Sequence, residues 1–320
     1  MLVDGKWDAE WQPVQAADAK GRFVRQTSEF RDWITPDGRP GPEGQTALPA
    51  QAGRYHLIVA YICPWASRTL MARALKGLEE VISVSVVDPR LSDQGWTFGD
   101  FPKATQQDEL IGARYMHQFY SHSDPTVSGR ATVPVLWDKQ TNRIVNNESA
   151  DILRILNSGF DALASKTVDL RPTALTDQIE ALNAQMYDSL NNGVYKAGFA
   201  TSQFAYDEAN DGIFAMLSTL EEQLSDGRPF LLGDSITEAD LRAFVTLIRF
   251  DAAYVGLFKT NRRRIADHPN LQRFLKTVLA VPGIRDTVHI DHIKAGYYSI
   301  KALNPNGIIP AGPDLADLGL

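Results

Sequence analysis

A short apolar segment, a proline-initiated segment with helical character and a second apolar segment follow one another early in the chain. Residues 55–62 (YHLIVAYI) are apolar and rich in β-formers, which predicts a buried strand. Pro64 suits the first helical position and Gly77 suits a helix C-cap, so we expect a helix over residues 64–76. Residues 81–89 (VISVSVVDP) predict a second strand. This βαβ unit predicts two parallel strands in a sheet that is covered by a helix.

A β-hairpin is expected after this unit. Residues 131–138 (ATVPVLWD) and 143–147 (RIVNN) flank a turn, and a helix is expected to follow directly. The order β-α-β, hairpin, α is the thioredoxin-like pattern. A long insert at residues 90–130 interrupts it, and we expect one helix within the insert, over residues 109–120.

Helical periodicity dominates the second half of the chain. Segments near 174–191, 206–225, 237–258 and 270–280 predict helices. Thr237 and Asp240 stand at capping-box spacing, and the Gly- and Pro-rich tail after Asn304 predicts irregular structure. A chain of 320 residues favours two domains. We expect a polar N-terminal extension (1–50), a thioredoxin-like domain (51–170) and an all-α domain (171–320), with residues 55–62 as the first core element.

Charge and composition exclude several classes of protein. The net charge of −7 and pI near 5.4 argue against nucleic-acid binding. No window approaches the ~20 apolar residues of a membrane span. The N-terminal residues lack a secretory signal, and a single cysteine cannot form an intramolecular disulfide, so we expect a cytoplasmic protein. His289 and His292 lack further ligands nearby in the sequence, so no metal site is expected.

Cys63 is the first residue with a chemical interpretation. It lies between the expected strand and the helix that begins at Pro64, where unpaired amides and the helix dipole favour a thiolate. The second cysteine of a redox motif would stand three residues on, and that residue is Ala66. A mixed disulfide on Cys63 would therefore need an external thiol to resolve it. The alternative is a buried structural cysteine.

Two further motifs carry a weaker signal. A cis Val133–Pro134 bond would expose the Val133 backbone to an extended peptide, whereas the alternative is an ordinary edge-strand proline. Glu148 and Ser149 stand at an expected helix start, where Ser can cap and amides can bind an anion. Such a start is also common without any ligand.

The order of these motifs resembles that of glutathione transferases. Cys63-Pro64-Trp65-Ala66, GWTF (95–98), GRATVPVLWD (129–138), NNGVYKAGFA (191–200), RFDAAYVGLFK (249–259) and DHIKAGYY (291–298) are similar to one branch of that family. This branch is the glutathionyl-hydroquinone reductases, or xi-class glutathione transferases. The resemblance covers about residues 30–300 and implies the glutathione transferase fold, with an α/β thioredoxin-like N-terminal domain and an all-α C-terminal domain.

The resemblance implies a glutathione site in the first domain. The tripeptide would lie along the backbone of Val133 and Pro134. Trp96 would pack on it, Arg130 would face a carboxylate, and Glu148 and Ser149 would bind the γ-glutamyl end. Without the resemblance, each would be read as a core or surface residue.

Three tyrosines match positions that line the aromatic-substrate pocket in the family: Tyr195, Tyr254 and Tyr297. Tyr195 would give a proton to the departing ring, and Tyr254 and Tyr297 would line the pocket and direct hydroxyls at the Cys63 sulfur. Tyr298 stands beside Tyr297 and leaves that position open by one residue. Outside the family, tyrosines in helical domains are usually core residues.

The implied activity is the reduction of glutathionyl-hydroquinones through a Cys63–glutathione mixed disulfide, with release of oxidised glutathione. Glutathione would be the co-substrate, no metal or nucleotide would be needed, and the protein would be a homodimer. One alternative is an omega-like thiol transferase or dehydroascorbate reductase. Another is a non-catalytic binding module with the same fold.

Overall fold

The computed structural model describes residues 1–10 and 16–320, which group into two compact units. The first unit contains residues 1–10 and 26–169, and the second contains residues 16–25 and 170–320. Residues 16–25 therefore belong with the helical part of the chain, although they precede the sheet in the sequence.

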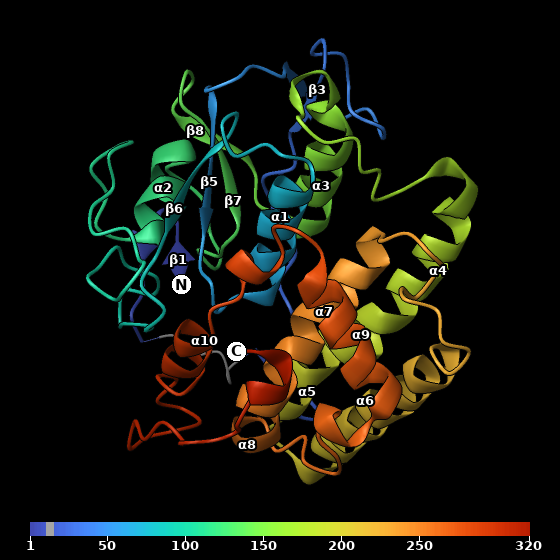
Figure 1. The fold of residues 1–320 in the computed structure, drawn as a ribbon. Helices are drawn as coiled ribbons and strands as arrows, with labels where there is room; N and C mark the ends of the chain where they lie inside the picture. The colour runs from blue at the N-terminus through green and yellow to red at the C-terminus, as the bar shows by residue number, and fades with distance from the viewer. Residues whose placement is uncertain (11–15) are drawn as a thin grey trace. The chain divides into compact units, whose positions relative to one another are not determined.

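A four-stranded sheet with the order β6-β5-β7-β8 forms the centre of the first unit (Figure 1). Its strands are β5 (Tyr55–Val59), β6 (Ser83–Val86), β7 (Val135–Asp138) and β8 (Arg143–Asn146). β5 pairs in parallel with β6 and antiparallel with β7, and β7 pairs antiparallel with β8. The predicted βαβ unit and hairpin are confirmed, with strands shorter than the apolar segments that predicted them.

Helices cover both faces of this sheet. Figure 1 shows α1 (Pro64–Leu75) and α3 (Ser149–Arg154) on one side and α2 (Met116–Ser123) on the other. A π-helical turn, Ile155–Gly159, continues α3. Pro64 occupies the first turn of α1. The helix ends at Leu75 with Lys76 as its C-cap, and Gly77 follows with a φ of 63°, which suits a residue without a Cβ. The helix predicted over residues 64–76 is confirmed.

The helix predicted over residues 109–120 begins later than expected, at Met116. The carboxylate of Asp108 accepts hydrogen bonds from the backbone N–H groups of Leu110, Ile111 and Ala113. The Gln118 side chain accepts from the two residues just before the helix. These side-chain acceptors compete with helical hydrogen bonding, so the segment before Met116 forms a loop.

The N-terminal extension contributes to the core, which contradicts the expectation that core elements begin at residue 55. β1 (Leu2–Val3) pairs with β2 (Lys6–Trp7), and β3 (Trp33–Thr35) pairs with β4 (Ala47–Pro49). Leu2, Trp33 and Ile34 are buried. These strands have only two or three residues, too few to show an alternating pattern in a polar sequence.

The second unit is helical. Its helices are α4 (Thr176–Met186), α5 (Gly193–Gly198), α6 (Gln203–Gln223), α7 (Glu238–Arg249), α8 (Val255–Leu257), α9 (Pro269–Ala280) and α10 (Ile290–Tyr297). π-helical turns at Tyr187–Asn191 and Phe250–Tyr254 follow α4 and α7. Short 3₁₀ turns in the two units are Asp161–Leu163, Thr173–Leu175, Ile265–Asp267, Arg285–Thr287 and Ala316–Leu318. The four predicted helical segments are present, while α5 and α10 were not predicted.

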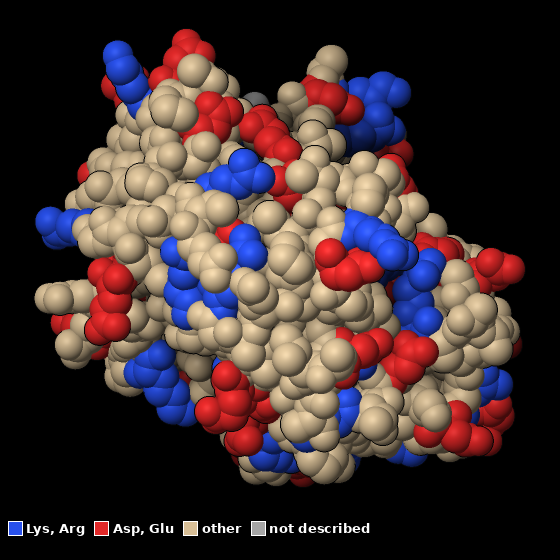
Figure 2. All heavy atoms as spheres, turned by 90° about the horizontal axis from the view of Figure 1, so that it is seen from above, with Lys and Arg blue, Asp and Glu red and all other residues tan. Residues whose placement is uncertain are grey.

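The predicted capping box is confirmed at the start of α7. The Asp240 carboxylate accepts hydrogen bonds from both the backbone N–H and the hydroxyl of Thr237. On the face that Figure 2 shows, Lys and Arg side chains are interspersed with Asp and Glu side chains, as the mixed charge along the sequence indicates. Among the described residues, no helix has the length and apolarity needed to cross a membrane.

Candidate functional site

Cys63 is the N-cap residue of α1, with the extended backbone that this position requires (φ −75°, ψ 118°). Its carbonyl accepts from the Ser67 N–H at 2.9 Å, and the first turn of any helix leaves other N–H groups without an intrahelical acceptor. The side chain is half-buried. The Cys63 sulfur lies 3.4 Å from the carbonyl oxygen of Val133, to which its thiol donates. The structure therefore brings two of the predicted site residues together.

The loop that carries Val133 is held by residues outside the predicted set. The Val133–Pro134 bond is cis, as the sequence suggested. The Tyr120 hydroxyl donates to the Thr132 carbonyl at 2.9 Å and accepts from the Thr132 N–H at 3.2 Å. The Asn147 amide donates to the same hydroxyl at 3.1 Å. Tyr120 therefore fixes the backbone next to Val133, a role hidden in the sequence because Tyr120 sits in an ordinary amphipathic helix.

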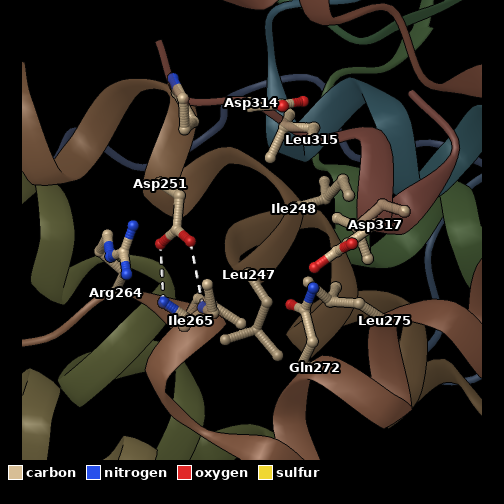
Figure 3. Close-up of a pocket in the computed structure, with 13 residues that line it drawn as sticks. Leu247, Ile248, Asp251, Arg264, Ile265, Gln272, Leu275, Asp314, Leu315 and Asp317 are labelled. Atoms are coloured by element: carbon tan, nitrogen blue, oxygen red, sulfur yellow. Dashed lines mark hydrogen bonds between the residues drawn. The ribbon is translucent and has the colours of Figure 1, made fainter.

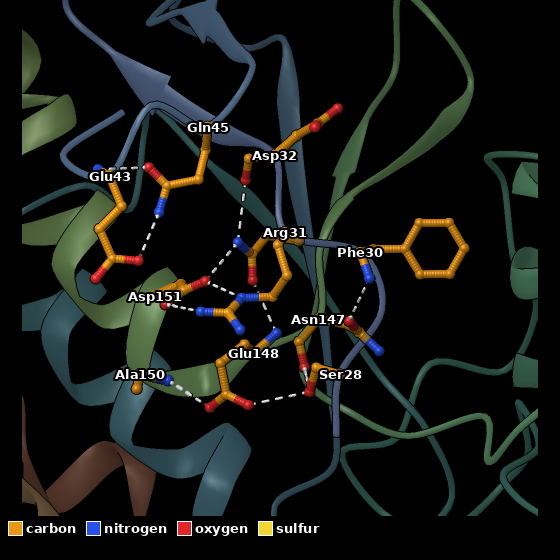
Figure 4. Close-up of polar contacts among 11 residues, drawn as sticks. Ser28, Phe30, Arg31, Asp32, Glu43, Gln45, Asn147, Glu148, Ala150 and Asp151 are labelled. Carbon is orange, nitrogen blue, oxygen red and sulfur yellow. Dashed lines mark hydrogen bonds and ion pairs between the residues drawn. The ribbon is translucent and has the colours of Figure 1, made fainter. Parts of the chain in front are cut away.

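Glu148, and not Ser149, caps α3. Glu148 has an extended backbone, and its carboxylate accepts from the Ala150 N–H at 3.1 Å and from the Ser28 hydroxyl at 3.0 Å (Figure 4). Ser149 is the first helical residue and is buried. The longer Glu side chain reaches back to the N2 amide, which removes the need for a Ser cap. Ser28 is a partner that the sequence did not indicate.

An ion pair stabilises the same end of α3. Arg31 binds both carboxylate oxygens of Asp151 (Figure 4). The Asn146 amide donates to Asp151 as well. The backbone N–H of Arg130 donates to the Gln26 side chain at 2.9 Å. Trp96 lies in the insert, half-buried, and its carbonyl accepts from the first residue of α2.

The three predicted tyrosines meet in the helical unit. The Tyr297 hydroxyl lies 2.6 Å from the Tyr195 hydroxyl and 2.8 Å from the Tyr254 hydroxyl. We call these residues the tyrosine triad. Tyr254 and Tyr297 are buried, whereas Tyr195 is partly exposed. Tyr297 is therefore the member of the Tyr297–Tyr298 pair that joins the other two.

Burial raises the pKa of Tyr254 and of Tyr297 well above the usual value, and the charge of Arg249 opposes this rise. Both phenols therefore stay protonated at neutral pH. Hydroxyls in this state can donate hydrogen bonds.

The segment NNGVYKAGFA positions Tyr195 through its small and polar residues. The Asn191 amide donates to α7 at the Arg242 carbonyl and the Thr246 hydroxyl, both at 2.8 Å. A Cβ at Gly198 would overlap the ring of Phe258, which stacks on Tyr254 with ring centroids 5.2 Å apart. Gly198 therefore permits the close approach of α5 to the aromatic cluster.

A separate pocket in the helical unit contains none of the predicted site residues (Figure 3). Leu247, Ile248 and Leu275 line it together with the C-terminal tail. Asp251 borders it and accepts from the N–H groups of Ile265 and Ala266, at 2.7 and 3.1 Å. Burial raises the pKa of Asp251. Its carboxylate stabilises the turn that begins at Ile265.

Family models match both units. Residues 62–158 match the N-terminal domain of glutathione S-transferases, and residues 203–277 match the C-terminal domain. The fold and the position of Cys63 thus define a glutathione transferase architecture with a cysteine at the start of α1.

Two curated relatives specify the branch. The chain is 51% identical to the glutathionyl-hydroquinone reductase YqjG of Escherichia coli, over 98% of this chain and 95% of the relative. It is 46% identical to the glutathionyl-hydroquinone reductase PcpF of Sphingobium chlorophenolicum, over 98% and 96%. The chain therefore belongs to the glutathionyl-hydroquinone reductases, the Xi class of glutathione transferases.

Solved structures agree with this assignment. Glutathione-bound YqjG of E. coli matches with a TM-score of 0.89 and 49% identity, covering 98% of this chain and 96% of that chain. The glutathione S-transferase Xi of Phanerochaete chrysosporium matches with a TM-score of 0.88 and 43% identity, covering 94% and 95%. The family that the sequence motifs indicated is confirmed.

Proposed function

We propose that this protein reduces glutathionyl-hydroquinones to hydroquinones, with glutathione as the reductant and Cys63 as the nucleophile. The observation that carries the proposal is the Cys63 thiol at the start of α1, in contact with the Val133 carbonyl. Extended peptides can lie along extended backbone, so a glutathionyl group along Val133 would present its sulfur to Cys63. Two relatives at 51% and 46% identity carry the name of this activity.

In the first step, the Cys63 thiolate attacks the glutathione sulfur. A sulfur–sulfur bond forms, and the bond between this sulfur and the aromatic carbon breaks. The ring carbon keeps the bonding electron pair and takes up a proton, which releases the hydroquinone. The products are a Cys63–glutathione disulfide and the reduced ring.

In the second step, a second glutathione thiolate attacks the mixed disulfide at the glutathione sulfur. Oxidised glutathione leaves, and the Cys63 thiolate is regenerated. One protein cysteine is sufficient for this cycle, because the second thiol comes from glutathione. The absence of a cysteine at position 66 supports this cycle over an internal disulfide.

Side chains of the sheet unit would bind glutathione. Trp96 would pack on the tripeptide, Arg130 would face a carboxylate, and Glu148 and Ser149 would take the γ-glutamyl end. The capping geometry supports this assignment for Glu148, because its carboxylate is already oriented at the start of α3 by Ala150 and Ser28. We expect the protein to act as a homodimer in the cytoplasm, without a metal or nucleotide.

Tyr195 would supply the proton to the departing ring. Its partial exposure supports this role over the other two members of the triad, which are buried. Tyr254 and Tyr297 would line the aromatic pocket and donate hydrogen bonds toward the Cys63 sulfur. Their raised pKa supports a donor role, since a protonated phenol can stabilise a thiolate.

Mass spectrometry tests the proposal directly. The protein is mixed with one equivalent of a glutathionyl-hydroquinone, without free glutathione, and both protein and small molecules are analysed. We expect one glutathione on Cys63 and one equivalent of hydroquinone, and Cys63→Ala is the thiol-free control. A second assay, with excess glutathione, compares turnover of the glutathionyl-hydroquinone with turnover of dehydroascorbate. Turnover of dehydroascorbate alone would indicate an omega-like enzyme. The absence of both adduct and turnover would indicate a binding module.

A further inference from the structure

Residues 16–25 form a strap on the helical unit, fixed by contacts of residues 20–23. The Ser202 hydroxyl donates to the Lys20 carbonyl at 2.7 Å, and Arg22 binds the carboxylate of Glu208, with its second nitrogen at 2.8 Å. The ring centroids of Phe23 and Phe199 are 5.5 Å apart. The strap therefore places the residues that follow Phe23 against α5.

Arg25, near the end of this strap, contacts both Tyr195 and the turn that precedes it. The Arg25 Nε donates to the Asn192 side-chain oxygen at 2.7 Å. Asn192 is buried at the N-cap position of α5, and its carbonyl accepts from the Tyr195 N–H at 3.0 Å. The Arg25 guanidinium lies over the Tyr195 ring, 4.9 Å from its centroid. One side chain thus fixes the helix start and covers the face of the phenol.

A guanidinium in this position affects a phenol in two ways. It attracts the negative face of the ring, which restricts the ring to one orientation. It also stabilises negative charge on the phenol oxygen, which favours loss of the proton. Both effects serve a tyrosine that acts as a proton donor.

We propose that Arg25 is a positioning residue for the reaction, which orients Tyr195 and stabilises the phenolate left when Tyr195 protonates the departing ring. This inference rests on the proposed function of Tyr195. The proton passes from the Tyr195 hydroxyl to the ring carbon, which also receives the electron pair of the broken carbon–sulfur bond. A proton from water then restores Tyr195. The second glutathione loses its thiol proton to water, and its thiolate resolves the Cys63 disulfide.

Other groups also set the charge around Tyr195. Charged and titratable side chains near Tyr195 come from the strap, from α5 and from neighbouring helices and turns. They are Arg25, Asp188, Lys196, Arg249, Tyr254 and Tyr297. Lys196 is paired with Asp188, so its charge is largely balanced. Arg249 acts on the two buried phenols. The Arg25 side chain lies over the Tyr195 ring itself.

The test is a double-mutant cycle on the first half-reaction, measured by stopped-flow release of hydroquinone. We expect Arg25→Met to slow this step by about five- to tenfold, the range that one charge contact of a partly exposed group supplies. In Arg25→Met, free glutathione should resolve a preformed Cys63–glutathione disulfide at the same rate as in the wild type. In the Tyr195→Phe background, Arg25→Met should change the first step by less than about twofold, because the residue through which it acts is gone. Arg22→Met is the matched control on the same strap.

A titration separates failure of this inference from failure of the proposed function. The Tyr195 phenol is followed by the phenolate absorbance of each protein minus that of its Tyr195→Phe counterpart. We expect its pKa to rise in Arg25→Met and to return toward wild type in Arg25→Lys, and this readout needs no turnover. If the wild type does not reduce glutathionyl-hydroquinones but the pKa shift of Tyr195 is observed, the proposed activity is refuted and the effect of Arg25 on Tyr195 is retained. An unchanged pKa, equal slowing of both half-reactions, or the same effect in Arg22→Met would overturn the role of Arg25.

Discussion

Replacing Tyr297 by Phe removes the central hydroxyl of the tyrosine triad. Tyr297 is hydrogen-bonded to Tyr195 at 2.6 Å and to Tyr254 at 2.8 Å, so one oxygen atom accounts for two hydrogen bonds. Tyr254 is 0% exposed and Tyr297 is 2% exposed. The change therefore leaves the Tyr254 hydroxyl in a buried position without this partner, whereas the Tyr195 hydroxyl lies near the surface.

The expected destabilisation follows from the number of bonds and from the stranded hydroxyl. Each net hydrogen bond contributes about 1 kcal/mol, and a stranded buried hydroxyl costs about 1 kcal/mol or more. Tyr297→Phe should therefore cost about 3 kcal/mol, and Tyr254→Phe should cost about 1 kcal/mol because Tyr297 keeps Tyr195. The double variant loses both bonds but strands no buried hydroxyl, and it should cost about 2 kcal/mol. The second substitution should thus restore part of the stability lost in the first.

Far-UV circular dichroism in a urea titration measures this effect in the helical unit. Five of the six tryptophans lie in the described part of the sheet unit, at positions 7, 33, 65, 96 and 137. Tryptophan fluorescence therefore follows mainly the sheet unit and serves as an internal comparison. Tyr298→Phe is the matched control, because its hydroxyl lies against Gly256 and not in the triad. The reasoning is refuted if Tyr297→Phe is no more destabilising than Tyr254→Phe, or if the two effects simply add.

Four further outcomes are expected. The Cys63 thiol should titrate below the usual pKa of about 8.5, because it lies at a helix N-terminus, and thiolate absorbance measures this. If Tyr254→Phe and Tyr297→Phe leave this pKa equal to that of the wild type, the two tyrosines do not stabilise the thiolate. Tyr195→Phe should slow the first half-reaction at least about tenfold and leave disulfide resolution unchanged; stopped-flow traces in which both steps slow equally would make it a packing residue. Gly198→Ala should lower both stability and first-step rate, because the added methyl displaces Phe258, and equal melting temperatures would contradict the close packing. His56 is buried between two serine hydroxyls, and burial lowers its pKa to about 4, so the folded protein favours the neutral form. The free energy of unfolding should therefore fall by up to about 3 kcal/mol as the pH drops from 6.5 to 4. Urea titrations followed by tryptophan fluorescence should show this loss, and His56→Gln should make the stability less dependent on pH.

The sequence predicted those parts of the fold whose signals are local. The helix after Cys63 has a proline at its start and a glycine after its end. The capping box predicted for α7 is present in the structure. The loop before Met116 was predicted as helix, because the carboxylate of Asp108 gives no sign in the sequence of its three backbone partners. Periodicity does not show where a side chain replaces helical hydrogen bonds.

The candidate site residues were predicted from motifs and from the family resemblance, and the residues that contact them were not predicted. Ser28 and Tyr120 contact the predicted site. Ser28 lies 120 residues from its partner Glu148 in the sequence, and Tyr120 lies 12 residues from its partner Thr132. Arg25 contacts Asn192 across 167 residues. Contacts between positions so far apart leave no periodic or spacing signal in a single sequence. The convergence of Tyr195, Tyr254 and Tyr297 likewise depends on packing that only the structure reveals.

The strap formed by residues 16–25 has a consequence for exchanging modules between related enzymes. A chimera joined near residue 170 would take the helices from one parent and keep the strap from the other. Such a hybrid would set a foreign residue against Tyr195 wherever the parents differ at position 25. A recombination design for this family therefore needs to move the strap together with the helices, as a discontinuous cassette, so that α5 keeps its original cover.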